Sequence, residues 1–135
     1  MLRFATNDTR TLTLSDGETL TVKTRLAHGE VQQMFQRMYE QRDGQTVVSA
    51  GSADAIIVAY LIDWSAKDER GQPVPLRGLS PADVQDRLNA MEHDSVIEIR
   101  NAIREHDDAM RAELDALKKT AGGVTVSPPI LQSVG

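Results

Sequence analysis

The stretch Ala55-Ile56-Ile57-Val58-Ala59-Tyr60-Leu61-Ile62-Asp63-Trp64 decides the fold, because its first eight residues are all apolar. A run of this length fits either a buried strand or a buried helix, since periodicity cannot separate the two. Ser52-Ala53-Asp54 supplies an N-cap and a first-turn acid, and together with the alanines this favours a helix. A helix without a polar face must be covered all round. We therefore expect the central helix of the domain, or half of a subunit interface.

The residues that precede this stretch predict a β-hairpin over 10–25. Polar and apolar side chains alternate on both sides of Ser15-Asp16-Gly17-Glu18, whose Asp-Gly pair suits a turn with positive φ. An isolated hairpin is marginal in water, so its apolar face is expected to rest on helices. That face would hold Leu12, Leu14, Leu20, Val22 and Leu26. Residues 2–5 are a candidate third strand.

Two shorter helices are predicted on either side of the apolar stretch. Apolar residues spaced i, i+3, i+4 and i+7 predict one at 29–42, ended by Asp43-Gly44, with 45–51 as a connector or short strand. Residues 66–79, rich in Gly and Pro, read as a loop. A serine N-cap followed by a first-position proline then predicts a helix over 80–91.

The longest predicted helix covers 95–119 and begins with a capping box from Ser95 to Glu98. At 1.5 Å per residue it is roughly 35 Å long, which is more than a small core needs. Its distal half is therefore a candidate for projecting or for pairing with another chain. The sequence as a whole predicts a mostly α, α+β fold, in which an N-terminal β-hairpin packs on about four helices. We expect one domain over 1–121 and an extended or flexible tail over 122–135.

Composition and charge exclude several classes of function. The 135 residues carry 20 acidic and 15 basic side chains, and a formal charge of −5 disfavours nucleic-acid binding, which depends on neutralising phosphates. The chain has no cysteine, which excludes thiolate metal sites and a cysteine nucleophile. Its longest apolar run is far below the roughly 20 residues that span a bilayer. Met1-Leu2-Arg3 leads into polar residues, so we expect no signal peptide and a cytoplasmic location.

No pattern of residues predicts catalysis, a cofactor or a metal. The histidines are His28, His93 and His106. His106 lies on an apolar stripe; the acids next to it in the helix diverge in direction, and of the positions four and eight residues earlier only Glu98 is a ligand type. No Gly-rich phosphate loop, Gly-x-Ser-x-Gly or His-Glu-x-x-His is present. We therefore expect that the chain is not an enzyme. The alternative of a small enzyme predicts loss of turnover on changing His93 or His106.

Trp64 is the only tryptophan, and it follows the apolar stretch directly. One interpretation is structural: the indole covers the core while Asp63 hydrogen-bonds the indole or a loop amide. The other is functional, because tryptophan is favoured at the energetic centres of protein interfaces. Both interpretations remain open from the sequence.

Residues 59–76, Ala-Tyr-Leu-Ile-Asp-Trp-Ser-Ala-Lys-Asp-Glu-Arg-Gly-Gln-Pro-Val-Pro-Leu, resemble a pattern of small proteins from tailed bacteriophages. In those proteins an apolar helix ends in Leu-Val-Asp-Trp-Ser, and a short acidic stretch, Gly-Lys-Pro-Val-Pro and a helix opened by Leu-Ser/Asp-Pro follow. In this chain the Leu-Ser/Asp-Pro phrase is Leu79-Ser80-Pro81. The phage proteins also have a Leu-x-x-Gly-Glu phrase after an N-terminal hairpin, and the similar phrase here runs from Leu26 to Glu30. The group is that of tail assembly chaperones and related tail-module proteins of long-tailed phages. The resemblance spans roughly residues 10–90.

This resemblance implies a non-enzymatic protein of phage tail assembly in the host cell cytoplasm. Such a chaperone covers the tape measure protein and recruits the major tail protein; we expect a homo-oligomer with neither nucleic acid nor membrane as partner. An acidic protein with an apolar surface can cover a long apolar client and stay dispersed. The candidate interface residues are Trp64, Ile99, Ile103, Met110 and Leu114. The alternatives are a ring-forming structural virion protein, either a head–tail joint or a minor tail component, and a host regulatory or adaptor protein.

Overall fold

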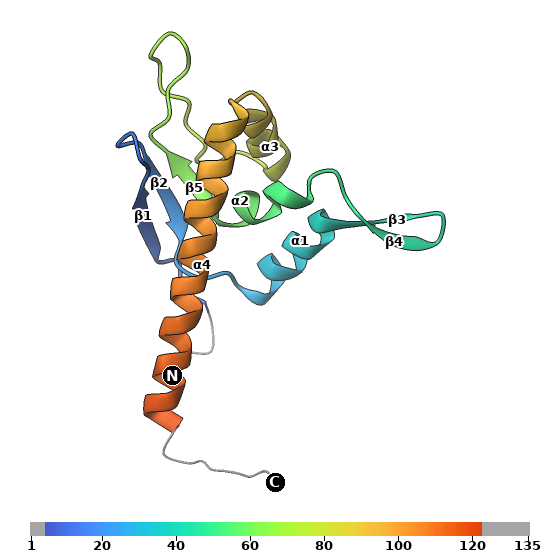
Figure 1. Cartoon of the computed structure of the whole chain (residues 1–135), viewed down its shortest axis with the longest axis vertical. Coiled ribbons are helices and arrows are strands. Elements are labelled where there is room, and N and C mark those ends of the chain that lie inside the picture. The colour runs from blue at the N-terminus through green and yellow to red at the C-terminus, as the bar shows by residue number, and fades with distance from the viewer. Residues whose placement is uncertain (1–4, 123–135) are drawn as a thin grey trace. The chain divides into compact units, whose positions relative to one another are not determined.

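The computed structural model describes residues 5–122, and within them the fold is α+β and mostly α, as the sequence predicts. The elements in chain order are β1 (Thr9–Thr13), β2 (Thr19–Lys23), α1 (His28–Met38), β3 (Tyr39–Arg42), β4 (Gln45–Val48), the 3-10 turn η1 (Ser52–Asp54), α2 (Ala55–Tyr60), β5 (Leu61–Trp64), α3 (Pro81–Asn89) and α4 (His93–Gly122) (Figure 1). The chain divides into two compact units, with the boundary inside α4 between Arg104 and Glu105. The predicted tail beyond Gly122 and the first residues of the candidate third strand lie outside the described residues.

The predicted N-terminal hairpin is confirmed, and it is part of a three-stranded antiparallel sheet in the order β1-β2-β5. Leu12 pairs with Leu20, and the turn between the strands places Gly17 at a φ of 88°, a conformation that glycine adopts without steric cost. The third strand of the sheet is β5, which comes from the apolar stretch. Leu20 and Val22 of β2, the central strand, are fully buried.

The apolar stretch forms a helix only in its first half, so the prediction of one helix over 55–64 is wrong in its second half. The helix α2 ends at Tyr60, where Leu61 takes an extended conformation, and β5 pairs antiparallel with β2. The pairing skips one residue between Asp63 and Leu61, which is a β-bulge. The reason for the switch is that β2 offers an edge of unpaired backbone groups, and a hairpin needs a third strand to be stable.

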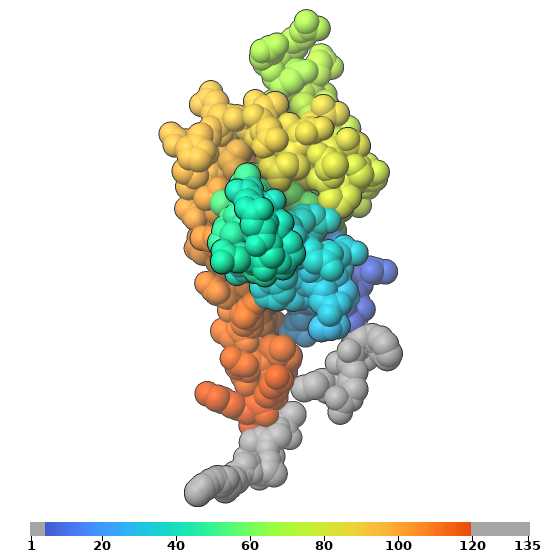
Figure 2. Space-filling view, turned by 90° about the vertical axis from the view of Figure 1, so that its right-hand side faces the viewer, coloured from blue at the N-terminus to red at the C-terminus, as the bar shows by residue number. Residues whose placement is uncertain are grey.

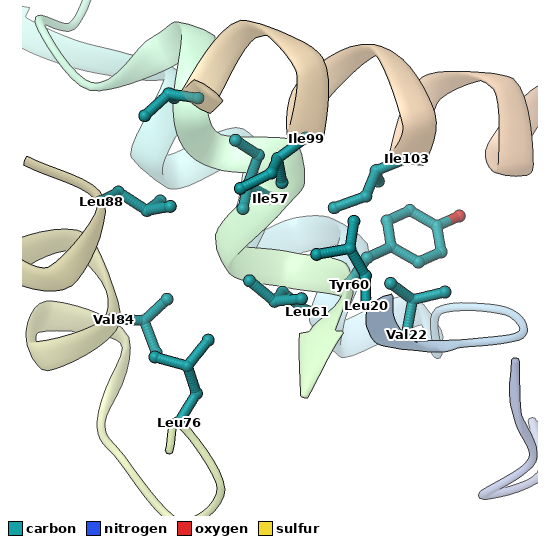
Figure 3. Packing of buried hydrophobic residues seen from close by; sticks show 11 residues of the cluster. Leu20, Val22, Ile57, Tyr60, Leu61, Leu76, Val84, Leu88, Ile99 and Ile103 are labelled. Carbon is teal, nitrogen blue, oxygen red and sulfur yellow. The ribbon is translucent and has the colours of Figure 1, made fainter. Parts of the chain in front are cut away.

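One hydrophobic core joins the sheet to α2, α3 and the first turns of α4. Figure 3 shows Ile57 of α2 beside Ile99 of α4, with Leu88 reaching toward them from α3. Ile57 has an exposed fraction of 0%, but Ile56 and Val58 of the same helix are only partly buried, so the predicted cover on all sides is incomplete. The other members of the core are Leu20, Val22, Tyr60, Leu61, Leu76, Val84, Val96 and Ile103.

The predicted helix over 29–42 is shorter than expected, because its last four residues form β3. Asp43 and Gly44, interpreted from the sequence as a helix stop, have φ angles of 53° and 78° and form the tight turn of a second hairpin, β3–β4. Two consecutive residues with positive φ are the geometry of a type I′ turn, whose twist matches that of paired strands. Strand-forming residues on both sides, Tyr39 and Val47-Val48, favour this hairpin over another helical turn.

The remaining predictions hold for the loop and for α3, and need correction at the start of α4. Residues 66–79 form a loop whose Leu76 returns to the core with an exposed fraction of 2%. The Ser80 hydroxyl caps α3 by accepting a hydrogen bond from the Asp83 amide at 3.2 Å. The long helix starts at His93, two residues before the predicted capping box. The carboxylate of Glu98 instead accepts a hydrogen bond from the Ser15 amide, at 2.9 Å, and so ties α4 to the β1–β2 turn.

An ion pair between Lys23 and Glu30 joins the end of β2 to the first turn of α1. The Glu30 carboxylate also accepts a hydrogen bond from the Ala27 amide at 2.8 Å, which satisfies one free N–H group at the helix start. Burial by itself would raise the pKa of Glu30, but the hydrogen bonds from Lys23 and Ala27 and the lysine charge outweigh it and lower the pKa. The charged form is thus favoured by folding.

We expect Glu30→Gln to remove a pH-dependent part of the stability. Since the pKa of Glu30 is lower in the folded chain, its contribution is fully present above the unfolded value of about 4.3 and is lost as pH falls through the folded pKa. Urea unfolding from pH 7 to pH 3 should therefore show the wild type above the variant at neutral pH and the two converging in acid. A constant difference across this range would contradict the ion-pair role.

Candidate functional site

Trp64 is held at the end of β5 by two sets of hydrogen bonds. Its indole N–H donates to the Val74 carbonyl oxygen at 2.5 Å, and its backbone N–H donates to an Asp63 carboxylate oxygen at 3.0 Å. The same oxygen accepts a hydrogen bond from the Leu76 amide at 2.9 Å, as the structural interpretation of Asp63 predicts. The half-buried indole packs against the core. Trp64 therefore contributes to the core with part of its indole, while the rest of the ring remains accessible.

Two adjoining hollows meet at Trp64, and we call them together the Trp64 groove. Trp64, Ala66, Lys67 and Met91 line both hollows. The smaller, of about 240 Å³, is bounded by the β1–β2 turn and the first turns of α4. The larger, of about 620 Å³, is bounded by the 66–74 loop and by the connection from α3 to α4. The result is an open trough with apolar side chains on its floor.

The walls of the Trp64 groove are mainly acidic. Two basic side chains, Lys67 and Arg87, face a larger set of carboxylates. The carboxylates are those of Asp16, Glu18, Asp68, Glu69, Glu92 and Glu98. A groove walled by one sign of charge attracts ligands of the opposite sign and increases their rate of association. The groove therefore suits a segment that presents an apolar side chain flanked by lysine or arginine.

The interface residues predicted on the long helix need correction. Ile99 and Ile103 have exposed fractions of 2% and 0% because they belong to the core, and Met110 has 3%. Ile99 and Ile103 therefore offer a partner little surface in this fold. Leu114 is half-buried. Of the five predicted interface residues, Trp64 and Ile99 line the Trp64 groove, and Ile99 does so with an exposed fraction of only 2%.

A second apolar surface was not anticipated from the sequence. Phe35, Tyr39 and Val48 have exposed fractions of 48%, 44% and 66%, and Phe35 and Tyr39 line a shallow hollow at the base of the β3–β4 hairpin. The sequence placed Phe35 on an inward-facing stripe and continued its helix through Tyr39. The Asp43-Gly44 pair, set between strand-forming residues, is the signal that could have revealed this hairpin.

None of the three histidines is among the residues that line the Trp64 groove. His28 and His93 are exposed at the starts of α1 and α4, while His106 is buried in α4. Among the described residues, no three His, Asp or Glu side chains are grouped so that they could hold a metal ion. The same part of the chain has no helix with the length and apolar character needed to cross a bilayer.

Comparison with protein-family models, with curated proteins and with solved structures gives no match for this chain. The interpretation of function therefore rests on one observation and one expectation from the sequence. One is the chemistry of the Trp64 groove, and the other is the resemblance of residues 59–76 to the small phage proteins described above. Both involve Trp64 and the loop that follows it.

Proposed function

We propose that the chain is a non-enzymatic protein of phage tail assembly, a tail assembly chaperone whose client is the tape measure protein. The observation that carries this proposal is the Trp64 groove, because part of its lining, Trp64 and the 66–74 loop, belongs to the stretch that resembles such proteins. An apolar floor under acidic walls can hold an apolar side chain of a helical client and, at the same time, attract its lysines and arginines. The major tail protein would be recruited to the covered client.

Three carboxylates of the groove are held in place by hydrogen bonds from the fold. Glu18 accepts a hydrogen bond from the Ser65 hydroxyl at 2.7 Å, and an Asp16 carboxylate oxygen accepts one from the Glu18 amide at 2.9 Å. Glu98 is likewise bound to the Ser15 amide. Carboxylates that serve as acceptors for the fold are held in place, so they contribute fixed negative charge to the groove.

Reversing the charge of the outer wall should abolish client binding without affecting the fold. Glu69 and Glu92 are exposed and line the larger hollow, so Glu69→Lys with Glu92→Lys replaces attraction of a basic client by repulsion. We expect copurification with coexpressed tape measure protein to fall about tenfold or more. Melting should stay near that of wild type, because surface substitutions usually change stability by about 0.5 kcal/mol or less.

The matched control for this experiment is Asp86→Lys. Asp86 is an exposed acid of α3 that does not line the groove, and its reversal changes the net charge in the same direction. Undiminished copurification by the double variant, or equal loss in the control, would contradict the assignment of the groove. Mass spectrometry of purified particles tests the function itself: a stoichiometric amount of this chain in virions would favour the structural alternative over the chaperone.

A further inference from the structure

The β3–β4 hairpin has the features of an element that pairs with another strand. It extends from the end of α1 and points toward the viewer in Figure 2, in teal (Figures 1 and 2). None of its residues, 39–48, is buried, and the apolar side chains of Tyr39 and Val48 face solvent. Its base is fixed to the helix, because the Ser49 amide donates to the Met38 carbonyl oxygen at 2.9 Å.

Within the described residues, β3 and β4 form a two-stranded sheet, so each has an outer edge without a partner strand in this chain. Hairpins of two strands are marginal in water, and exposed edges are templates for pairing with another chain. The hairpin can gain both hydrogen bonds and apolar burial by pairing with a further strand. The identity of that strand follows from the charges of β3.

Glu40 and Arg42 lie on the same face of β3, two residues apart, and form an ion pair at 2.6 Å. Gln41 lies between them on the opposite face, where it pairs with Thr46 of β4 and donates a hydrogen bond to the threonine hydroxyl at 2.7 Å. A second β3 strand that runs antiparallel and is centred on Gln41 places its base opposite the acid of the first strand, and its acid opposite the base. The order Glu40, Gln41, Arg42 is therefore complementary to itself. This property is what a two-fold symmetric interface requires.

We propose that a second copy of this chain is the partner, with the two β3 strands pairing antiparallel about a two-fold axis at Gln41. In this register Glu40 lies opposite the partner's Arg42, and Arg42 lies opposite the partner's Glu40. Each charge then has opposite charges as its neighbours along and across the strands, an arrangement that stabilises sheets. The tip of each hairpin would lie near the partner's Phe35 and Tyr39, whose exposed surfaces become covered. The dimer concerns assembly of this chain and is independent of the client.

Charge reversal tests this register in the full chain by sedimentation equilibrium. We expect the wild type to dimerise, and Glu40→Arg or Arg42→Glu alone to weaken the dimer about tenfold or more, because both cross-axis pairs become like-charged. An equimolar mixture of the two single variants should form a heterodimer, and the double variant should regain self-association. A monomeric wild type, or a mixture that does not associate, would overturn the proposal.

Cysteine cross-linking tests which edge is used, and the chain offers a clean background because it has no cysteine. Residues directly opposite each other in antiparallel strands have Cα atoms about 4.5–5.5 Å apart, within the range of a disulfide. Gln41→Cys should therefore give a disulfide-linked dimer on mild oxidation. Thr46→Cys is the control, since three strand spacings, about 14 Å, would separate the two copies of that residue. Cross-linking of the control in preference to Gln41→Cys would show pairing through β4 and would overturn the proposal.

Discussion

Ile57→Asp is expected to unfold the compact unit that ends at Arg104. Ile57 has no exposed surface and lies at the centre of a core that joins the sheet to three helices (Figure 3). An aspartate there would be a buried charge without a partner, at a cost of several kcal/mol or more. Domains of this kind are typically stable by about 5–15 kcal/mol, so much or all of the stability is lost. Circular dichroism during heating should show no cooperative transition, or one at a much lower temperature.

The control for this experiment is Leu117→Asp, which makes a similar substitution at an exposed position. Leu117 has an exposed fraction of 53%, so its replacement should change the free energy of unfolding by about 0.5 kcal/mol or less. Soluble Ile57→Asp protein with a wild-type melting curve would contradict the placement of α2 in the core. If both variants were insoluble, the loss could not be assigned to the burial of Ile57.

The outline of the fold follows from the sequence because its local signals agree with one another. The alternation around Asp16-Gly17 gives the β1–β2 hairpin, and the serine cap with Pro81 gives the start of α3. The apolar spacing along α4 gives a helix that runs from His93 to Gly122. Each of these elements is determined by residues within the element or next to it, so the local sequence is sufficient to predict it.

Two helix predictions were wrong at their ends because strand pairing replaced the last part of each helix. Residues 61–64 and 39–42 each continue a helical pattern, yet each forms a strand. The first pairs with the open edge of β2, and the second pairs with β4 across a turn of two residues with positive φ. The partner of β5 lies far away in the sequence, so the local pattern of apolar residues does not contain it. The β3–β4 hairpin is signalled locally by Asp43-Gly44, but the pattern of apolar residues alone does not include that signal.

The exposed part of the candidate site was predictable only at Trp64. An apolar stripe on a helix has the same sequence pattern whether it faces a core or a partner, and Ile99 and Ile103 face the core. The acidic walls of the Trp64 groove come from segments far apart in the sequence, such as the turn at Asp16 and the helix at Glu98. Only the tertiary structure brings these carboxylates to one place.

Asp63→Ala should detach the 66–79 loop and destabilise the chain by about 2–4 kcal/mol, because a buried donor left without an acceptor costs about 1–3 kcal/mol. One oxygen of Asp63 accepts hydrogen bonds from the amides of Trp64 and Leu76, and its other oxygen lies 3.8 Å from the Arg77 guanidinium. The amide of Leu76 belongs to a residue that is 2% exposed, so water cannot easily replace the carboxylate. Urea unfolding followed by circular dichroism measures the loss.

Trp64 reports the local effect of the same substitution, because it is the only tryptophan in the chain. Its indole donates to the Val74 carbonyl oxygen in the loop, so release of the loop exposes the ring and should shift its emission to longer wavelength. Asp63→Asn is the matched variant: it keeps an acceptor oxygen but loses the charge, and it should cost about 1 kcal/mol with little change in emission. Equal losses in the two variants would mean that the charge, and its attraction to Arg77, matters more than the two amide hydrogen bonds. A wild-type melting curve for Asp63→Ala would show that other contacts of the loop, such as the burial of Leu76, hold it in place.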